Sequence, residues 1–106
     1  MDNNASLMMD MGLKPHQFQL LQDMVFSHPG VQHAWIFGSR ATGTFRGNSD
    51  IDIMLEGNAL TFDDLAIIQD KLEQSTLPFT VDIVLKHQTQ SSELITRIRE
   101  EAKQVK

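Results

Sequence analysis

The chain has no cysteine, a deficit of positive charge and no long apolar run, and each absence excludes a class of protein. Without cysteine there is no disulfide framework and no thiolate metal site, which fits a reducing compartment, so we expect a cytoplasmic protein. Lysine and arginine number 9 against 14 aspartates and glutamates, and this net charge of -5 provides no overall field to attract duplex nucleic acid or an anionic membrane. Its apolar runs fall far short of the roughly 20 residues that span a bilayer, and we expect no signal peptide.

The length and composition indicate one globular domain. The chain has 106 residues, 41% hydrophobic and 22% charged, which is ordinary for a compact fold with one core, and we expect a single domain over residues 1–106. Residues 1–13 are polar and methionine-rich without a clear period, so they are expected to form a flexible arm or a short helix. Met8, Met9 and Met11 would then be part of that arm or an adaptable contact surface.

Hydrophobic periodicity predicts helices and strands in the order helix, strand, strand, helix, strand, helix. A helix is expected from Pro15 to about Ser27, strands over 31–37, 49–55 and 77–85, a helix capped by Thr61 or Asp63, and a last helix from Ser91 or Ser92 that includes Val105. Trp35 and Phe37 are expected in the core, although one of them could line a base pocket. This order predicts an α/β (α+β) fold with a small mixed sheet and helices packed mainly on one face.

Three aspartates stand on strands that are otherwise apolar. Because side chains alternate along a strand, Asp50 and Asp52 project from the face opposite to Ile51 and Ile53. Two adjacent like charges need water, protonation or a divalent cation, and an isolated pair of this kind is more often an exposed strand face. Asp82 lies in the middle of "FTVDIVL" and completes a three-carboxylate site if its strand pairs beside the first; a salt bridge to Arg46 or Lys86 is the alternative.

A glycine turn, "GSRATG", follows the first predicted strand directly. Gly38 allows a sharp turn and close approach of a ligand, and Ser39 supplies a hydroxyl where a short helix begins. Backbone N–H groups at such a turn face an anion, and Arg40 and Arg46 add local positive charge. A plain strand-to-helix turn could have the same sequence, so this turn indicates phosphate binding only in combination with the carboxylates.

Together, "GSRATGTFRGNSDIDI" and "VDIV" resemble the nucleotidyltransferases of the DNA polymerase β type, in particular the minimal nucleotidyltransferase (MNT) family. The resemblance covers about residues 32–85 and implies the polymerase β-like fold. It assigns Gly38 and Ser39 to nucleotide binding, and Asp50, Asp52 and Asp82 to catalysis and metal binding. Further expected nucleotide contacts are Arg40, Arg46 and Ser49.

The resemblance also implies a reaction and a partner. Two Mg²⁺ ions and ATP are the expected cofactor and substrate, and members of HEPN/MNT toxin–antitoxin systems transfer AMP to a tyrosine hydroxyl of an adjacently encoded HEPN-domain toxin. In a chain too short for a second substrate domain, the acceptor is expected to dock on another molecule, in a hetero-oligomer. The alternative is a binding module of the same fold that neutralises its partner without chemistry.

Overall fold

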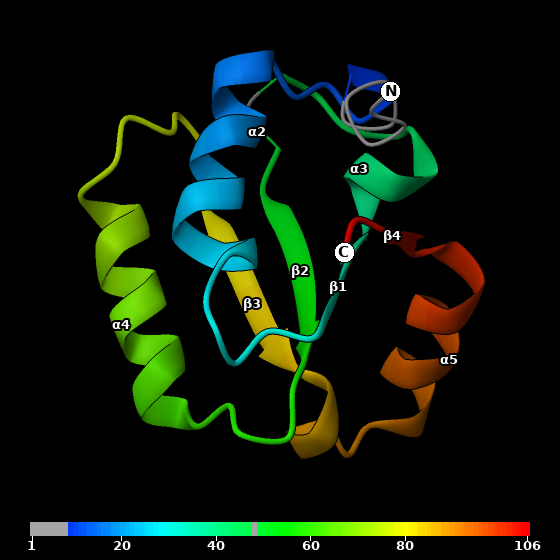
Figure 1. Ribbon diagram of the computed structural model, residues 1–106. Helices are drawn as coiled ribbons and strands as arrows, with labels where there is room; N and C mark the ends of the chain where they lie inside the picture. Colours follow the sequence, from blue (N-terminus) through cyan, green and yellow to red (C-terminus); the bar gives the residue numbers. More distant parts are fainter. Residues whose placement is uncertain (1–8, 48) are drawn as a thin grey trace.

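A four-stranded mixed sheet forms the centre of the computed structural model, which describes residues 9–47 and 49–106 (Figure 1). The strands are β1 (His33–Phe37), β2 (Ile51–Glu56), β3 (Val81–Leu85) and β4 (Lys103–Gln104), in the spatial order β3-β2-β1-β4. β2 pairs antiparallel with β1 and parallel with β3, and β4 pairs antiparallel with β1. The predicted mixed sheet is therefore confirmed.

Two of the helices begin directly after a residue whose side chain caps them. The helices are α2 (Pro15–Leu21), which continues into the π-helix η1 (Gln22–Phe26), α3 (Ser39–Thr42), α4 (Phe62–Glu73), the 3-10 helix η2 (Lys86–Gln88) and α5 (Ser92–Glu101). The Thr61 hydroxyl accepts from the Asp64 backbone N–H at 3.2 Å, and that of Ser91 accepts from Leu94 N–H at 3.3 Å. In the described part of the chain no helix is long and apolar enough to cross a membrane.

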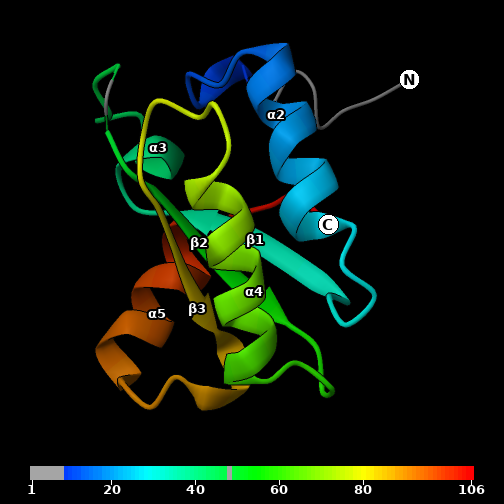
Figure 2. The ribbon, with the colours of Figure 1, turned by 90° about the vertical axis from the view of Figure 1, so that its left-hand side faces the viewer.

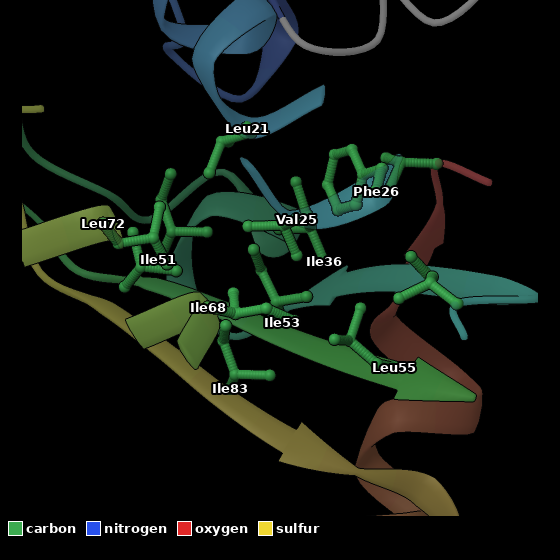
Figure 3. Packing of buried hydrophobic residues seen from close by; sticks show 14 of the residues in the cluster. Leu21, Val25, Phe26, Ile36, Ile51, Ile53, Leu55, Ile68, Leu72 and Ile83 are labelled. Atoms are coloured by element: carbon green, nitrogen blue, oxygen red, sulfur yellow. The ribbon is translucent and has the colours of Figure 1, made fainter. Parts of the chain in front are cut away.

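The larger core lies between one face of the sheet and the helices α2, η1 and α4 (Figure 3). The alternation in β2 places Ile51, Ile53 and Leu55 on this face, each fully buried. The helices contribute Leu21, Val25 and Ile68 to the same cluster. This face is closed by apolar packing, so any polar site must lie elsewhere.

The opposite face carries a smaller core covered by α5. Ile98 packs there with Phe37 and Met54, and the half-buried Trp35 packs against this cluster. Figure 2 shows α5 and α2 on opposite sides of the sheet. Most helical packing is on one face, as predicted, while α5 covers part of the face from which Asp52 and Asp82 project.

The prediction for the end of the chain is wrong, and one of the two alternatives for its start does not hold for residues 11–13. The last helix ends at Glu101, and residues 103–104 form β4, whose Gln104 pairs with Trp35, so Val105 is buried as part of an edge strand's continuation. Residues 11–13 are not a loose arm, because Met11 and Leu13 are each only 2% exposed within the larger core. Residues 9–10 are helical, and residues 1–8, with Met8, lie outside the described residues.

Candidate active site

The predicted carboxylates gather at one end of the sheet. In the parallel pairing of β2 with β3, Asp52 lies directly opposite Asp82, and in the antiparallel pairing with β1 it lies opposite Phe37. Asp50 comes two residues before Asp52, just ahead of β2, and is exposed, as is Asp82. The site is therefore open to solvent on a face that α5 only partly covers.

The glycine turn lies against this carboxylate cluster. Gly38 has φ 76°, in the left-handed region that glycine tolerates best. A Cβ at Gly38 would come within 2.3 Å of Asp52 Oδ2, so the absence of a side chain here makes room for the carboxylate. The sequence thus predicted the need for glycine, but the neighbour that imposes it is Asp52.

The turn after Gly38 is tightly hydrogen-bonded. The backbone N–H groups of Ala41 and Thr42 both donate to the Gly38 carbonyl at 3.1 Å, and Thr44 N–H donates to the Ser39 carbonyl at 3.0 Å. Ser39 is the first residue of α3, as predicted, and its half-buried side chain makes no hydrogen bond to any described residue. Its hydroxyl is therefore available to a ligand at the start of α3, one residue after Gly38.

The electrostatics of the cluster centre on Asp52. Its partial burial raises the pKa of the Asp52 carboxyl, and the charges of Asp82 and Asp50 raise it further. Arg97 of α5 acts in the opposite direction and lowers that pKa. Arg97 lies on α5 next to Ile98, whose packing against Phe37 brings this part of the helix towards the carboxylates.

The side chains of this cluster are of the chemical type that binds Mg²⁺. Carboxylate oxygens are the ligands that Mg²⁺ prefers, and a divalent cation would relieve the repulsion that raises the pKa of Asp52. Across the described ranges, however, no three acidic or histidine side chains are grouped closely enough to hold a metal ion. Because Mg²⁺ commonly keeps water and phosphate oxygens as ligands, an incomplete protein shell is the expected form for a site shared with a nucleotide.

Arg40 does not have the predicted role. Its side chain is only 1% exposed, and its guanidinium N–H groups donate to backbone carbonyls, among them that of Ser49 at 2.9 Å. A buried guanidinium whose donors are used inside the protein cannot reach a nucleotide at the surface of the turn. The prediction that Arg40 contacts the nucleotide is therefore wrong.

Arg46 and Ser49 have separate positions in the loop that leads into β2. Arg46 is exposed, and its backbone N–H donates to Ser49 Oγ at 2.7 Å. The Ser49 hydroxyl therefore shapes the loop, and nucleotide contact by both residues stays a prediction. Among the described residues Asp82 forms no ion pair with Arg46 or Lys86, its two alternative partners, and Lys86 pairs with Glu56 at 2.8 Å.

Comparison with known protein families identifies the class of protein. The family model described as "Polymerase beta, Nucleotidyltransferase" matches residues 19–106. The chain therefore belongs to this family of nucleotidyltransferases, and the matched region contains all three carboxylates and the glycine turn. Comparison with the curated proteins gives no match.

Solved structures with the same fold come from toxin–antitoxin complexes. A toxin–antitoxin with AMP-PNP contains a chain that is 30% identical, with a TM-score of 0.65, over 84% of this chain and 68% of the other. A mutant of the toxin–antitoxin MntA-HpeT is 27% identical, with a TM-score of 0.66, over 89% of this chain and 73% of the other. A chain in the structure of a tri-AMPylated Shewanella oneidensis HEPN toxin in complex with MNT antitoxin is 23% identical, with a TM-score of 0.60, over 94% of this chain and 71% of the other. This match shows the common fold.

Proposed function

We propose that this chain is a Mg²⁺-dependent protein adenylyltransferase that acts as the antitoxin of a HEPN-type toxin in the cytoplasm. It transfers AMP from ATP to a hydroxyl of that toxin, and a tyrosine hydroxyl is the proposed acceptor. The observation that carries the proposal is the pairing of Asp52 with Asp82 across β2 and β3, directly beside the turn at Gly38. The similarity to a toxin–antitoxin with AMP-PNP supports ATP as the donor.

Different groups of the chain would act on the ATP donor and on the acceptor hydroxyl. The Ser39 hydroxyl and the backbone of the Gly38 turn bind the triphosphate, with Arg46 as an exposed cation within the same connection. Asp50 and Asp52 would hold Mg²⁺, with Asp82 as the third ligand. When bound, the metal neutralises charge on the phosphates and acidifies the acceptor hydroxyl.

AMP transfer needs only ATP and the acceptor hydroxyl as reactants. The acceptor oxygen forms a bond to the α-phosphorus, the bond from that phosphorus to the bridging oxygen of the β-phosphate breaks, and pyrophosphate leaves. The proton of the acceptor hydroxyl passes to Asp82, whose exposed carboxylate lies beside Asp52. The open face over Asp82 is the side from which a protein hydroxyl can approach.

The partner's intact mass tests the proposal. The full chain is incubated with the adjacently encoded HEPN toxin, ATP and Mg²⁺, and the toxin is expected to gain the mass of one or more AMP groups. The gain should disappear with EDTA, with Asp52→Asn in this chain, and with phenylalanine in place of the modified tyrosine of the toxin. A toxin that stays unmodified while it is bound and inactive would instead establish the non-catalytic binding module.

A further inference from the structure

Arg40 is held by an unusually complete set of backbone acceptors. Nε and Nη2 donate to the carbonyl of Ser49 at 3.2 and 2.9 Å, and Nη2 also donates to that of Gly47 at 3.4 Å. Nη1 donates to the carbonyls of Met11 at 2.9 Å and Gly12 at 3.4 Å. One side chain thus joins the glycine turn, the segment before α2 and the connection into β2.

Two aromatic rings enclose the same guanidinium. Its Cζ lies 5.2 Å from the ring centroid of Phe45 and 4.7 Å from that of Phe79. Gly12 is packed on this stack, because a Cβ there would be 2.3 Å from Phe45 Cε2 and 3.1 Å from Arg40 Nη1. Burial lowers the pKa of Arg40, and the charge of Asp50 opposes that shift.

We propose that Arg40 is a positioning residue for nucleotidyl transfer, which fixes the segment bearing Arg46 and Asp50 relative to the turn at Gly38 and uses the carbonyls of residues 11 and 12 as its outer anchor. The segment before α2 is thereby part of the active-site framework. The claim about the reaction rests on the proposed function, whereas the claim about the framework stands on the hydrogen bonds themselves.

The geometry explains why arginine is needed. A lysine at position 40 would keep the charge but offers three donors on a single nitrogen, so it cannot bond acceptors on both sides of the stack at once. In Arg40→Lys the connection into β2 should lose its fixed position while α4 and the larger core stay intact. A role limited to general stability would instead loosen all parts of the protein together.

Limited proteolysis of the full chain separates these two roles without any assay of activity. Trypsin cleavage after Arg46 reports opening of the connection into β2, and cleavage after Lys71, inside α4, reports global unfolding. Arg40→Lys is expected to raise the rate after Arg46 about tenfold or more while the rate after Lys71 changes less than about twofold. Equal acceleration at both sites would overturn the proposal.

Kinetics test the same proposal at the reaction. With the toxin as acceptor, Arg40→Lys should lower kcat by about tenfold to a hundredfold and raise the Mg²⁺ concentration for half-maximal rate, because Asp50 is displaced. The KM for ATP should rise as well, because Arg46 is displaced with the same segment, so kcat and the Mg²⁺ dependence decide the test. A raised KM for ATP at unchanged kcat and Mg²⁺ dependence would overturn the positioning role.

A pair of glycine variants provides a matched control. Gly12 and Gly43 both have left-handed backbone, with φ 76° and 82°, but a Cβ at Gly43 meets nothing within 4 Å. Gly12→Ala, which places a methyl group against Phe45 and Arg40, should reproduce both effects of Arg40→Lys, and Gly43→Ala should leave the ratio of the two cleavage rates as in the parent. Identical behaviour of the two variants would contradict the proposal.

The outcomes also distinguish this proposal from the proposed function. A parent protein that transfers no AMP refutes the proposed function, and the tryptic ratio then still decides whether Arg40 holds the framework. Conversely, an active parent whose Arg40→Lys and Gly12→Ala variants keep full kcat and Mg²⁺ dependence supports the function and refutes the positioning role.

Discussion

The carboxylate of Asp52 occupies the space that a side chain at Gly38 would need. The two residues belong to β2 and to the turn after β1, and a Cβ on Gly38 would approach Asp52 Oδ2 to 2.3 Å. The glycine turn and the Asp52 carboxylate thus form one packed unit, in which the carboxylate fits only because residue 38 has no side chain.

Gly38→Ala should therefore damage the site more than the fold. The change combines a strained backbone at φ 76° with displacement of Asp52, and we expect a loss of about 1–3 kcal/mol in the free energy of unfolding. AMP transfer should fall about a hundredfold or more. Gly43→Ala is the control, because Gly43 has a similar φ but open space around it, so this variant shows the effect of backbone strain alone. A parental rate of AMP transfer in Gly38→Ala would refute the linkage between the turn and Asp52.

Replacing Asp52 by asparagine should stabilise the protein when no metal is present. Because the pKa of Asp52 is raised by burial and by Asp82 and Asp50, its contribution to stability is present below the ordinary pKa of about 3.9 and is lost as pH rises through the raised value. Asp52→Asn should melt about 2–4 °C higher near neutral pH, and the difference should vanish in acid. Asp10→Asn, at an exposed position, is the control, and an equal rise there would contradict the assignment.

Glu56 should show the opposite pH dependence. Its hydrogen bond to Lys86, whose Nζ lies 2.8 Å away, lowers the pKa of the Glu56 carboxyl, and the charges of Lys86 and His33 lower it further. The contribution to stability is then present above the ordinary pKa and is lost as pH falls through the lowered one. Thermal melts of Glu56→Gln should show a small decrease at neutral pH that disappears in acid. A decrease that persists in acid would point to lost packing instead.

The neighbouring residues Ile67 and Ile68 of α4 test the larger core. Ile68 is 1% exposed and packs on the sheet, whereas Ile67 is 52% exposed. Ile68→Ala should lower the free energy of unfolding by about 2–5 kcal/mol, measured by denaturant titration. Ile67→Ala, the same chemical change one residue away, should stay within about 0.5 kcal/mol. Similar losses in both would mean that α4 is packed differently.

Local patterns predicted the strands and the carboxylate face well. The alternation in "SDIDIML" places Asp52 opposite to Ile51 and Ile53. The pairing of its strand with "VDIVL", which the sequence analysis states only as a condition for the carboxylate site, is found in the parallel register of Asp52 with Asp82. The caps at Thr61 and Ser91 could also be predicted from the sequence, since each cap bonds a backbone N–H only three residues further along the chain.

Long-range contacts account for the wrong predictions. Arg40 beside a glycine turn has the sequence signature of a phosphate ligand, and its true partners at residues 11, 12 and 79 are distant along the chain. The apolar spacing of Ala102 and Val105 suits a helix, but pairing with the free edge of β1 ends it at Glu101. The burial of Met11 depends on the same tertiary packing, which no local period encodes.

The most direct measurement is the single-turnover rate of AMP transfer in a preformed complex with the toxin, compared between the parent chain and Asp82→Asn. Asp82 is exposed and lies opposite Asp52, so its substitution should leave the fold and the affinity for the toxin unchanged. The account predicts a fall in the transfer rate of about a hundredfold or more at an unchanged Kd for the toxin. A parental transfer rate in Asp82→Asn would contradict the three-carboxylate site.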